Sequence, residues 1–215
     1  MLFRSLACIQ LGIIYATGQS VPQNYETAAL WYARAAARGV PEGRYNLAFL
    51  HLRGLGVSQD TQHGLRLLSD AVDSGSVDAA WALYRQYTEG TYVAPEAGLA
   101  VRWLLRAAQM GSGSAACLLA QRLERGDAHA PPADVVIPLL QKSAASGDPA
   151  AQTRLALWHL DGKFVARDAR LAFRWFERAA QGGDAFAQAW MGDALTTGGV
   201  VSADASGAEI GRAHV

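Results

Sequence analysis

The side chains that could support chemistry are few in this sequence and lie far apart along it. Five histidines form no metal-ligand spacing with a cysteine or a carboxylate. They are His51, His63, His129, His159 and His214. The Ser-x-x-Lys pattern of penicillin-recognising enzymes is absent, because Leu139 and Leu160 stand three residues before the two lysines. Gly54 and Gly56 lack the other residues of a phosphate-binding loop. We therefore expect no catalytic residue, no metal ligand and no cofactor.

Composition argues against two further classes of partner. The 215 residues carry 19 basic and 19 acidic side chains, so we expect no nucleic-acid partner for this neutral chain. No stretch approaches the ~20 apolar residues of a spanning helix, so we expect no membrane insertion.

Cys8 and Cys117 are too few for a disulfide scaffold and are predicted to be small hydrophobic residues rather than reactive thiols. The bias towards alanine, arginine and glycine is typical of GC-rich codons and indicates a bacterial source.

Glycines recur every 36 residues and define a repeat register along the chain. One series consists of Gly18, Gly54, Gly90, Gly126, Gly162 and Gly198. A second series consists of Gly39, Gly75, Gly111, Gly147 and Gly183. Residues 36 apart occupy equivalent positions of this register and form a column. A period of this length that never slips predicts an array of repeats, each of which buries its apolar face against its neighbours.

Each repeat is predicted to contain two helices. The first helix of the second repeat runs from Gly43 to Arg53 and is ended by Gly54, a residue suited to the left-handed conformation. The second helix starts near Asp60, a good N-cap residue, and ends at Gly75. Equivalent caps stand at Asp168 and Asp204. The expected fold class is therefore all-α, an α/α solenoid of about six 36-residue repeats.

The two faces of the first helices differ in how much they vary between repeats. Gly43, Leu47, Ala48 and His51 fall on one face, and their columns keep small or apolar residues, so this face is predicted to pack. The opposite columns vary freely, which is typical of a surface that packing does not dictate. The candidate partner-binding residues on these columns are Tyr45, Phe49, Arg53, Trp81, Arg85, Glu89, Gln121 and Arg125.

Trp81 is the tryptophan on this variable surface. Flanked by Arg85 and Glu89, it is typical of the anchors that interface hot spots use. An alternative stays open, in which the curvature of the solenoid buries part of its column against the adjacent helix. The tryptophans of another column, Trp31, Trp103 and Trp175, are predicted to be packing residues of the second helices. Truncation of a buried Trp103 to alanine would then cost ~3–5 kcal/mol.

The fourth repeat departs most from the pattern. Its loop runs from Asp127 to Ala133, and His129 replaces the valine of the other repeats. Pro138 lies inside the expected second helix, where proline removes a backbone donor and clashes with the preceding turn. We expect a shortened or kinked helix from about Asp134. This defect is either a hinge or a tolerated surface irregularity.

Both ends of the chain are unusual for a repeat array. Residues 1–20 resemble a signal peptide in composition, but they occupy the repeat columns and are expected to form a first helix. Their apolar outer face predicts that further repeats preceded Met1.

The last seven residues, Glu209 to Val215, match the translation of a common sequencing adapter. They are expected to be a non-native or disordered tail, which leaves the sixth repeat without its second helix.

The segment from Arg44 to Asp60 resembles the hallmark stretch of the Sel1-like repeat, a relative of the tetratricopeptide repeat. The segments from Asp168 to Gly182 and from Tyr25 to Gly39 resemble the second half of that repeat. The resemblance covers residues 1–208, with repeats at about 4–39, 40–75, 76–111, 112–147 and 148–183 and a partial repeat at 184–208. It implies a right-handed superhelix whose first helices line a concave groove that binds proteins or peptides.

The leading functional hypothesis is a non-enzymatic protein-interaction scaffold, expected to be a fragment of a longer bacterial protein. The alternative is a hydrolase acting on β-lactam or cell-wall-derived compounds, by analogy with secreted, cysteine-rich relatives. Those relatives carry paired cysteines in each repeat, whereas Cys8 and Cys117 lie three repeats apart in different columns. A purely structural spacer is a third hypothesis. The partner, the compartment and the oligomeric state are not indicated by the sequence.

Overall fold

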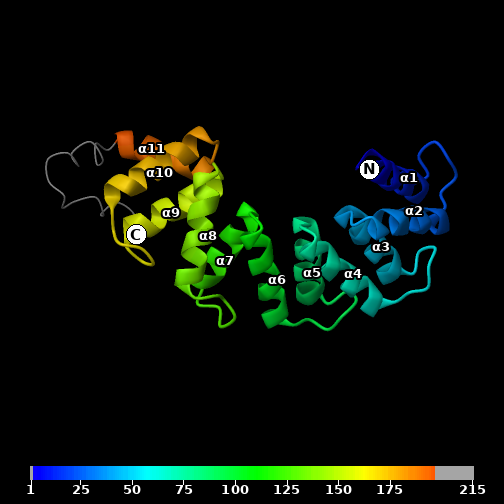
Figure 1. Cartoon of the computed structure of the whole chain (residues 1–215). Helices are drawn as coiled ribbons and strands as arrows, with labels where there is room; N and C mark the ends of the chain where they lie inside the picture. Colours follow the sequence, from blue (N-terminus) through cyan, green and yellow to red (C-terminus); the bar gives the residue numbers. More distant parts are fainter. Residues whose placement is uncertain (1, 197–215) are drawn as a thin grey trace. The chain divides into compact units, whose positions relative to one another are not determined.

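The structure, a computed structural model, describes residues 2–196 of the chain, with side chains from Leu6 onward except at residue 195. All regular secondary structure in this range is α-helical (Figure 1). The chain divides into two units, residues 1–110 and 111–215, and each is described by itself. The first unit contains α1 (Leu2–Thr17), α2 (Tyr25–Ala37), α3 (Pro41–Arg53), α4 (Thr61–Asp73), α5 (Val77–Glu89) and α6 (Ala97–Gln109). The second contains α7 (Gly113–Glu124), α8 (Ala133–Ala145), α9 (Pro149–Asp161), α10 (Ala169–Gln181) and α11 (Ala185–Thr196).

The helix ends follow the repeat register. The second helices α2, α4, α6, α8 and α10 begin at residues 25, 61, 97, 133 and 169, a constant shift of 36. Gly54 ends α3 in the left-handed conformation with a φ of 68°, and Asp60 caps α4 by accepting a 2.8 Å hydrogen bond from the His63 amide. Asp168 caps α10 in the same way. These predicted stops and starts are confirmed, while Asp204 and the tail lie outside the described residues.

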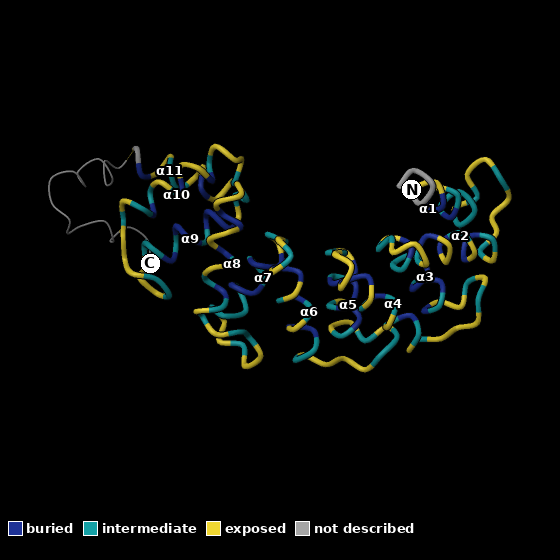
Figure 2. The backbone as a smooth tube through the Cα atoms, in the orientation of Figure 1, coloured by how far each residue is buried: buried dark blue, intermediate teal, exposed yellow. Residues whose placement is uncertain are grey.

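The predicted packing columns of the first helices form the core of each unit. Leu47 is 8% exposed and Leu83 is 1% exposed in the first unit, and Leu119 and Leu155 are buried in the second. Small residues let the helices approach closely. A Cβ atom added to Gly43 would lie 2.7 Å from the backbone nitrogen of Ala36, so α2 and α3 could not meet as they do with a larger residue there. Figure 2 shows the exposed segments concentrated in the loops that join the helices.

The second helices bury a different column from the one predicted. Trp31, Trp103 and Trp175 are only partly buried, which corrects their expected role as core residues. The next residue along each helix forms the core instead. This buried column consists of Tyr32, Leu68, Leu104, Leu140 and Phe176. The tryptophan rings lie about 100° further round the helix, at the edge of the packed face.

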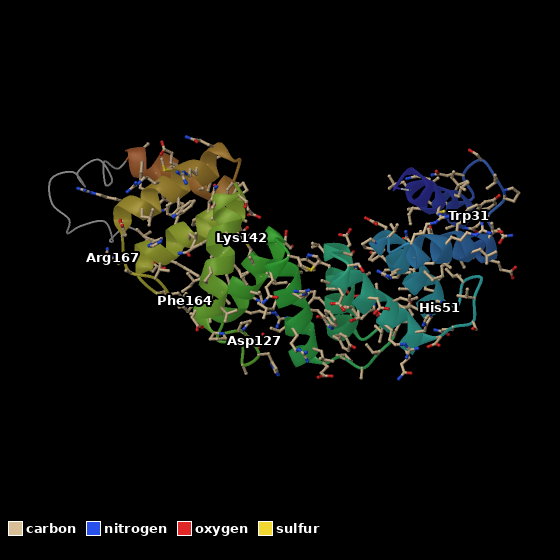
Figure 3. The ribbon with its side chains drawn as sticks, viewed as in Figure 1. Trp31, His51, Asp127, Lys142, Phe164 and Arg167 are labelled. Atoms are coloured by element: carbon tan, nitrogen blue, oxygen red, sulfur yellow. The ribbon has the colours of Figure 1, made fainter. Side chains whose placement is uncertain are left out.

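Arginine covers the outer face of two of these rings. The Arg34 guanidinium lies 4.6 Å from the Trp31 ring centroid, and the Arg178 guanidinium lies 5.1 Å from that of Trp175. Each arginine follows its tryptophan by three residues, so one helical turn brings them together. The tryptophan column therefore bridges core and solvent on the outer side of the second helices, where Figure 3 labels Trp31.

Pro138 is accommodated within a helix of normal length. The helix α8 begins at Ala133, close to the predicted start, and its 13 residues equal those of α6 and α10. The predicted shortening is therefore wrong, and the alternative of a kink stays a prediction. Both Pro138 and Asp134 are exposed. The carbonyl group of Asp134, which loses its backbone partner to the proline, therefore lies on the solvated side of the helix, where water can bind it.

The first and last described helices both belong to the repeat array. In α1, Cys8 and Ile9 join a buried cluster with Ala28, Ala29 and Tyr32 of α2, so residues 2–17 form the predicted first helix. In α11, Ala187 is buried with Phe176 and Ala179 of α10. The expected loss of the sixth repeat's second helix falls on residues 197–215, outside the described part of the chain.

Candidate functional site

Three of the candidate residues form a row along α3. The rings of Tyr45 and Phe49, one turn apart, meet edge to face with centroids 5.0 Å apart. The guanidinium of Arg53, a further turn along, lies 5.9 Å from the Phe49 centroid. Both rings are partly buried and Arg53 is exposed. The four-residue spacing read from the sequence therefore places two aromatic rings and one cation on the same side of the helix.

The equivalent row on α5 is formed by Trp81, Arg85 and Glu89. The Trp81 ring meets the Tyr84 ring edge to face at a centroid distance of 5.4 Å. Arg85 donates a 3.1 Å hydrogen bond to Glu89, with side chains 65% and 49% exposed. Trp81 itself is partly buried. Packing therefore covers some of the indole and leaves the rest accessible, and the role of Trp81 as an anchor stays a prediction.

We refer to the two rows together as the α3–α5 face, which consists of Tyr45, Phe49, Arg53, Trp81, Arg85 and Glu89. Burial raises the pKa of the Tyr45 hydroxyl above its usual value. The negative charge of Asp78 raises this pKa further, and the positive charge of Arg85 lowers it. Both charges belong to α5, whereas Tyr45 belongs to α3. Tyr45 therefore lies near enough to α5 for its hydroxyl to be influenced by charges on that helix.

Gln121 and Arg125, the other two candidates, belong to the second unit. Gln121 is partly buried on α7, and Arg125 is the exposed C-cap residue of that helix.

Cys117 lies one turn before Gln121. Burial raises the pKa of the Cys117 thiol to about 11, so the thiolate needed for nucleophilic attack is scarce at neutral pH. Neither Cys8 nor Cys117 forms a disulfide bond.

A polar cluster in the second unit escaped the sequence interpretation. Glu124 accepts hydrogen bonds from the Trp158 indole, at 2.7 Å, and from the Arg154 guanidinium. Lys163 donates a 3.3 Å hydrogen bond to the Glu124 carbonyl oxygen. The cluster joins α7 to α9 across 30 residues or more of sequence. These side chains are occupied with one another, and the cluster is a structural clamp.

The irregular loop after α7 has its own organising residue, Asp127, labelled in Figure 3. Its carboxylate accepts a 2.9 Å hydrogen bond from the His129 amide and a 2.6 Å hydrogen bond from Arg122. The bond from the His129 amide contributes most to lowering the pKa of Asp127, and Arg122 lowers it further. His129, which stands where other repeats have valine, therefore belongs to a local hydrogen-bonded turn and not to a ligand site.

The remaining polar side chains pack rather than form a reactive group. The rings of His51 and His63 meet edge to face with centroids 4.5 Å apart, and the Nδ1 atom of His51 is buried without a hydrogen bond. His51 is partly buried, as predicted for its column (Figure 3). Across residues 2–196, no three histidine, cysteine or carboxylate side chains are grouped closely enough to hold a metal ion. No helix in the described range is long and apolar enough to cross a bilayer.

Comparison with known families identifies the repeat. The Sel1 repeat family profile matches residues 5–40, 41–76, 80–112 and 149–184, which is most of the chain. Residues 113–148, between the last two matches, form the fourth repeat. This is the repeat that contains the loop at Asp127 and Pro138.

Solved structures share the helical-repeat fold. A protective antigen present in uropathogenic Escherichia coli strains, described as displaying an SLR fold, is similar with a TM-score of 0.70 and 29% identity, covering 90% of this chain and 42% of the antigen. A Sel1 repeat protein from Oxalobacter formigenes is similar in fold with a TM-score of 0.63 and 24% identity, covering 85% of this chain and 75% of that protein.

One curated relative shows sequence similarity over a short stretch. It is the ERAD-associated E3 ubiquitin-protein ligase component HRD3B of Arabidopsis thaliana, 41% identical over 54 residues. The match covers 25% of this chain and 9% of the relative. The chain therefore spans less than a tenth of this relative and less than half of the Escherichia coli antigen.

Proposed function

Because the chain belongs to the Sel1 repeat family, we propose that it is a non-enzymatic protein-interaction scaffold whose α3–α5 face binds a polypeptide. The observation that carries this proposal is the set of partly buried aromatic rings beside exposed charges on α3 and α5. Rings held by packing lose little conformational freedom when they bind, and tryptophan, tyrosine and arginine dominate the energetics of protein interfaces. Helices also position such residues more rigidly than loops do.

The surface divides into an apolar centre and a charged edge. Tyr45, Phe49 and Trp81 would receive apolar side chains of the partner. The charged side chains of Arg53, Arg85 and Glu89 would fix its orientation. Gln121 and Arg125 remain candidate contacts in the second unit. The relative named as a component of a ubiquitin ligase supports an assembly role, because a component works within a complex. No pairing of a nucleophile with a base in the described range favours the alternative of a hydrolase.

The test is to select peptides from a random display library on the immobilised full chain and to measure the affinity of the selected peptides for variants. We expect Trp81→Ala combined with Arg85→Ala to weaken binding by at least about 30-fold, which corresponds to one hot-spot residue of ~2 kcal/mol. Trp31→Ala is the matched control, because Trp31 is a partly buried tryptophan on the outer side of α2.

The control should leave the affinity within about threefold of the parent, since a few tenths of a kcal/mol is the usual effect of a distant surface change. Circular dichroism would verify that both variants fold. Selected peptides that bind the Trp81/Arg85 double variant as tightly as the parent would refute the assignment of the α3–α5 face.

A further inference from the structure

The two ends of α3 carry opposite charges on the same side as its aromatic row. Glu42 lies in the first turn of the helix and Arg53 in its last turn, and both side chains are exposed. At ~100° per residue, an arc of ~80° around the helix axis contains all four residues of this side, Glu42, Tyr45, Phe49 and Arg53. The two partly buried rings therefore lie between an acidic end and a basic end.

These two charges have no ionic partner within the described chain. The side chain of Glu42 forms no ion pair or hydrogen bond across residues 2–196. The guanidinium of Arg53 forms no ion pair there either and lies over the Phe49 ring. The helix dipole favours an acid in the first turn and a base in the last turn, but it does so on every side of the helix. It therefore does not explain why both charges lie on the side of the rings.

The helix α5 repeats the acidic end and neutralises the other. Asp78 is exposed in the first turn of α5, occupies the same column as Glu42 and forms no ion pair with any residue that the structure describes. Further along α5, Arg85 pairs with Glu89, so these two residues add no net charge. The α3–α5 face is therefore bordered by two carboxylates at one end and by the guanidinium of Arg53 at the other.

The two carboxylates border the same end of the face. Burial raises the pKa of the Tyr45 hydroxyl, and the negative charge of Asp78 raises it further. Tyr45 lies one turn after Glu42, so the first turn of α5 is near the start of α3. This end of the face therefore attracts a cation, and the opposite end attracts an anion.

Resting on the proposed function of this face, we infer that its partner is a polypeptide segment with an apolar middle, a basic side chain at one end and an acidic side chain at the other. The basic side chain pairs with Glu42 and Asp78, the apolar middle covers the rings, and the acidic side chain pairs with Arg53. The rise of ~1.5 Å per residue places Glu42 and Arg53 ~16 Å apart along the axis of α3. An extended chain covers this length with about five residues.

Partners of a single charge sign fit this surface less well. A nucleic acid or an anionic membrane would place phosphate groups against Glu42 and Asp78. A wholly basic peptide would place a cation against Arg53. Like charges brought together at an interface oppose binding, so the two ends of the face select for a segment that carries both signs.

The experiment selects peptides from a random display library on the immobilised full chain and, separately, on the variant E42K/D78K. Both selections are made at low salt, because salt screens exposed charges. We expect peptides selected on the parent to carry a basic and an acidic residue on opposite sides of an apolar stretch. Peptides selected on E42K/D78K should keep the apolar stretch and replace the basic residue with an acidic one.

An exchange of charge gives the quantitative measurement. Replacing the basic residue of a parent-selected peptide with glutamate should weaken its binding to the parent by at least about fivefold, and E42K/D78K should recover this loss. The matched control is E26K/D70K, which makes the same change in net charge at exposed positions of α2 and α4. The control should recover none of the loss, and circular dichroism should show both variants folded.

The outcomes separate this inference from the function on which it rests. Selected peptides without a charge pattern, the same pattern on the parent and on E42K/D78K, or recovery by E26K/D70K would overturn the inference. If such peptides still lose affinity for the Trp81→Ala/Arg85→Ala double variant, the proposed function stands and only the charge pattern is wrong. If they bind that double variant as tightly as the parent, the proposed function is wrong and the inference fails with it.

Discussion

The indole Nε1 of Trp158 donates a 2.7 Å hydrogen bond to the carboxylate of Glu124 and ties α9 to α7. Arg154 donates to the other carboxylate oxygen. The side chains of Arg154 and Glu124 are only 18% and 28% exposed, so solvent replaces these partners poorly. Removing one partner of this clamp should therefore cost more stability than removing one partner of an exposed ion pair.

We predict that Glu124→Ala lowers the free energy of unfolding by about 1–3 kcal/mol, because it leaves a buried donor without a partner. Glu89→Ala is the matched control, since its pair with Arg85 is well exposed and should contribute less than ~1 kcal/mol. Urea denaturation monitored by circular dichroism measures both. Equal losses in the two variants would contradict the role assigned to the clamp.

The buried column of the second helices gives a second prediction. Leu104 is fully buried, whereas Trp103 beside it is only partly buried. Leu104→Ala should cost about 2–5 kcal/mol, and Trp103→Ala should cost less than Leu104→Ala, although tryptophan is the larger residue. The same denaturation experiment ranks the two variants. A larger loss in Trp103→Ala than in Leu104→Ala would show that the tryptophan column contributes more to the core.

The loop after α3 depends on one glycine that passes close to another segment. A Cβ atom at Gly56 would lie 2.2 Å from the carbonyl carbon of Tyr25, and the residue has a φ of +65°. Gly56→Ala should therefore lower the free energy of unfolding by more than ~2 kcal/mol. Gly75 also has positive φ but open space around it, so Gly75→Ala should cost only ~1 kcal/mol. Thermal melts of the two variants would show whether the close approach, rather than the backbone conformation alone, sets the difference.

The raised pKa of Cys117 predicts an inert thiol. Burial is its main cause and raises the pKa to about 11 from 9.0, so the folded state keeps a proton that the unfolded state releases as pH rises above 9. Stability should therefore fall as pH increases from 9 towards 11. In a Cys8→Ser background, alkylation of the native protein at pH 8 should be slow compared with the unfolded protein. Rapid alkylation of the native protein would show that Cys117 is accessible and ionised.

The repeat period predicted the helix boundaries well because glycine and aspartate act locally. Gly54 ends α3 through its own backbone conformation, and Asp60 starts α4 through its own carboxylate. The period identifies equivalent positions, but it does not identify which of two adjacent positions faces the core. The positions of Trp103 and Leu104 both recur with the 36-residue period, and the difference in their burial is set by tertiary packing.

The proximity of candidate side chains on one helix was predictable from the sequence, whereas the proximity of side chains on different helices was not. Four-residue spacing placed Tyr45 beside Phe49, because this relationship depends only on helix geometry. The proximity of Tyr45 to Asp78 and Arg85 depends on how α3 and α5 are arranged, which the spacing does not encode. The pairing of Glu124 with Trp158 has the same origin and was likewise missed.

Photo-crosslinking tests the central claim, that the α3–α5 face is the partner-binding surface, most directly. A benzophenone amino acid is placed at position 49 on this face or at position 30, where Leu30 is 64% exposed on α2. A peptide selected on the parent chain should crosslink to position 49 and not to position 30. Crosslinking at position 30 alone, or equally at both positions, would contradict the proposed surface.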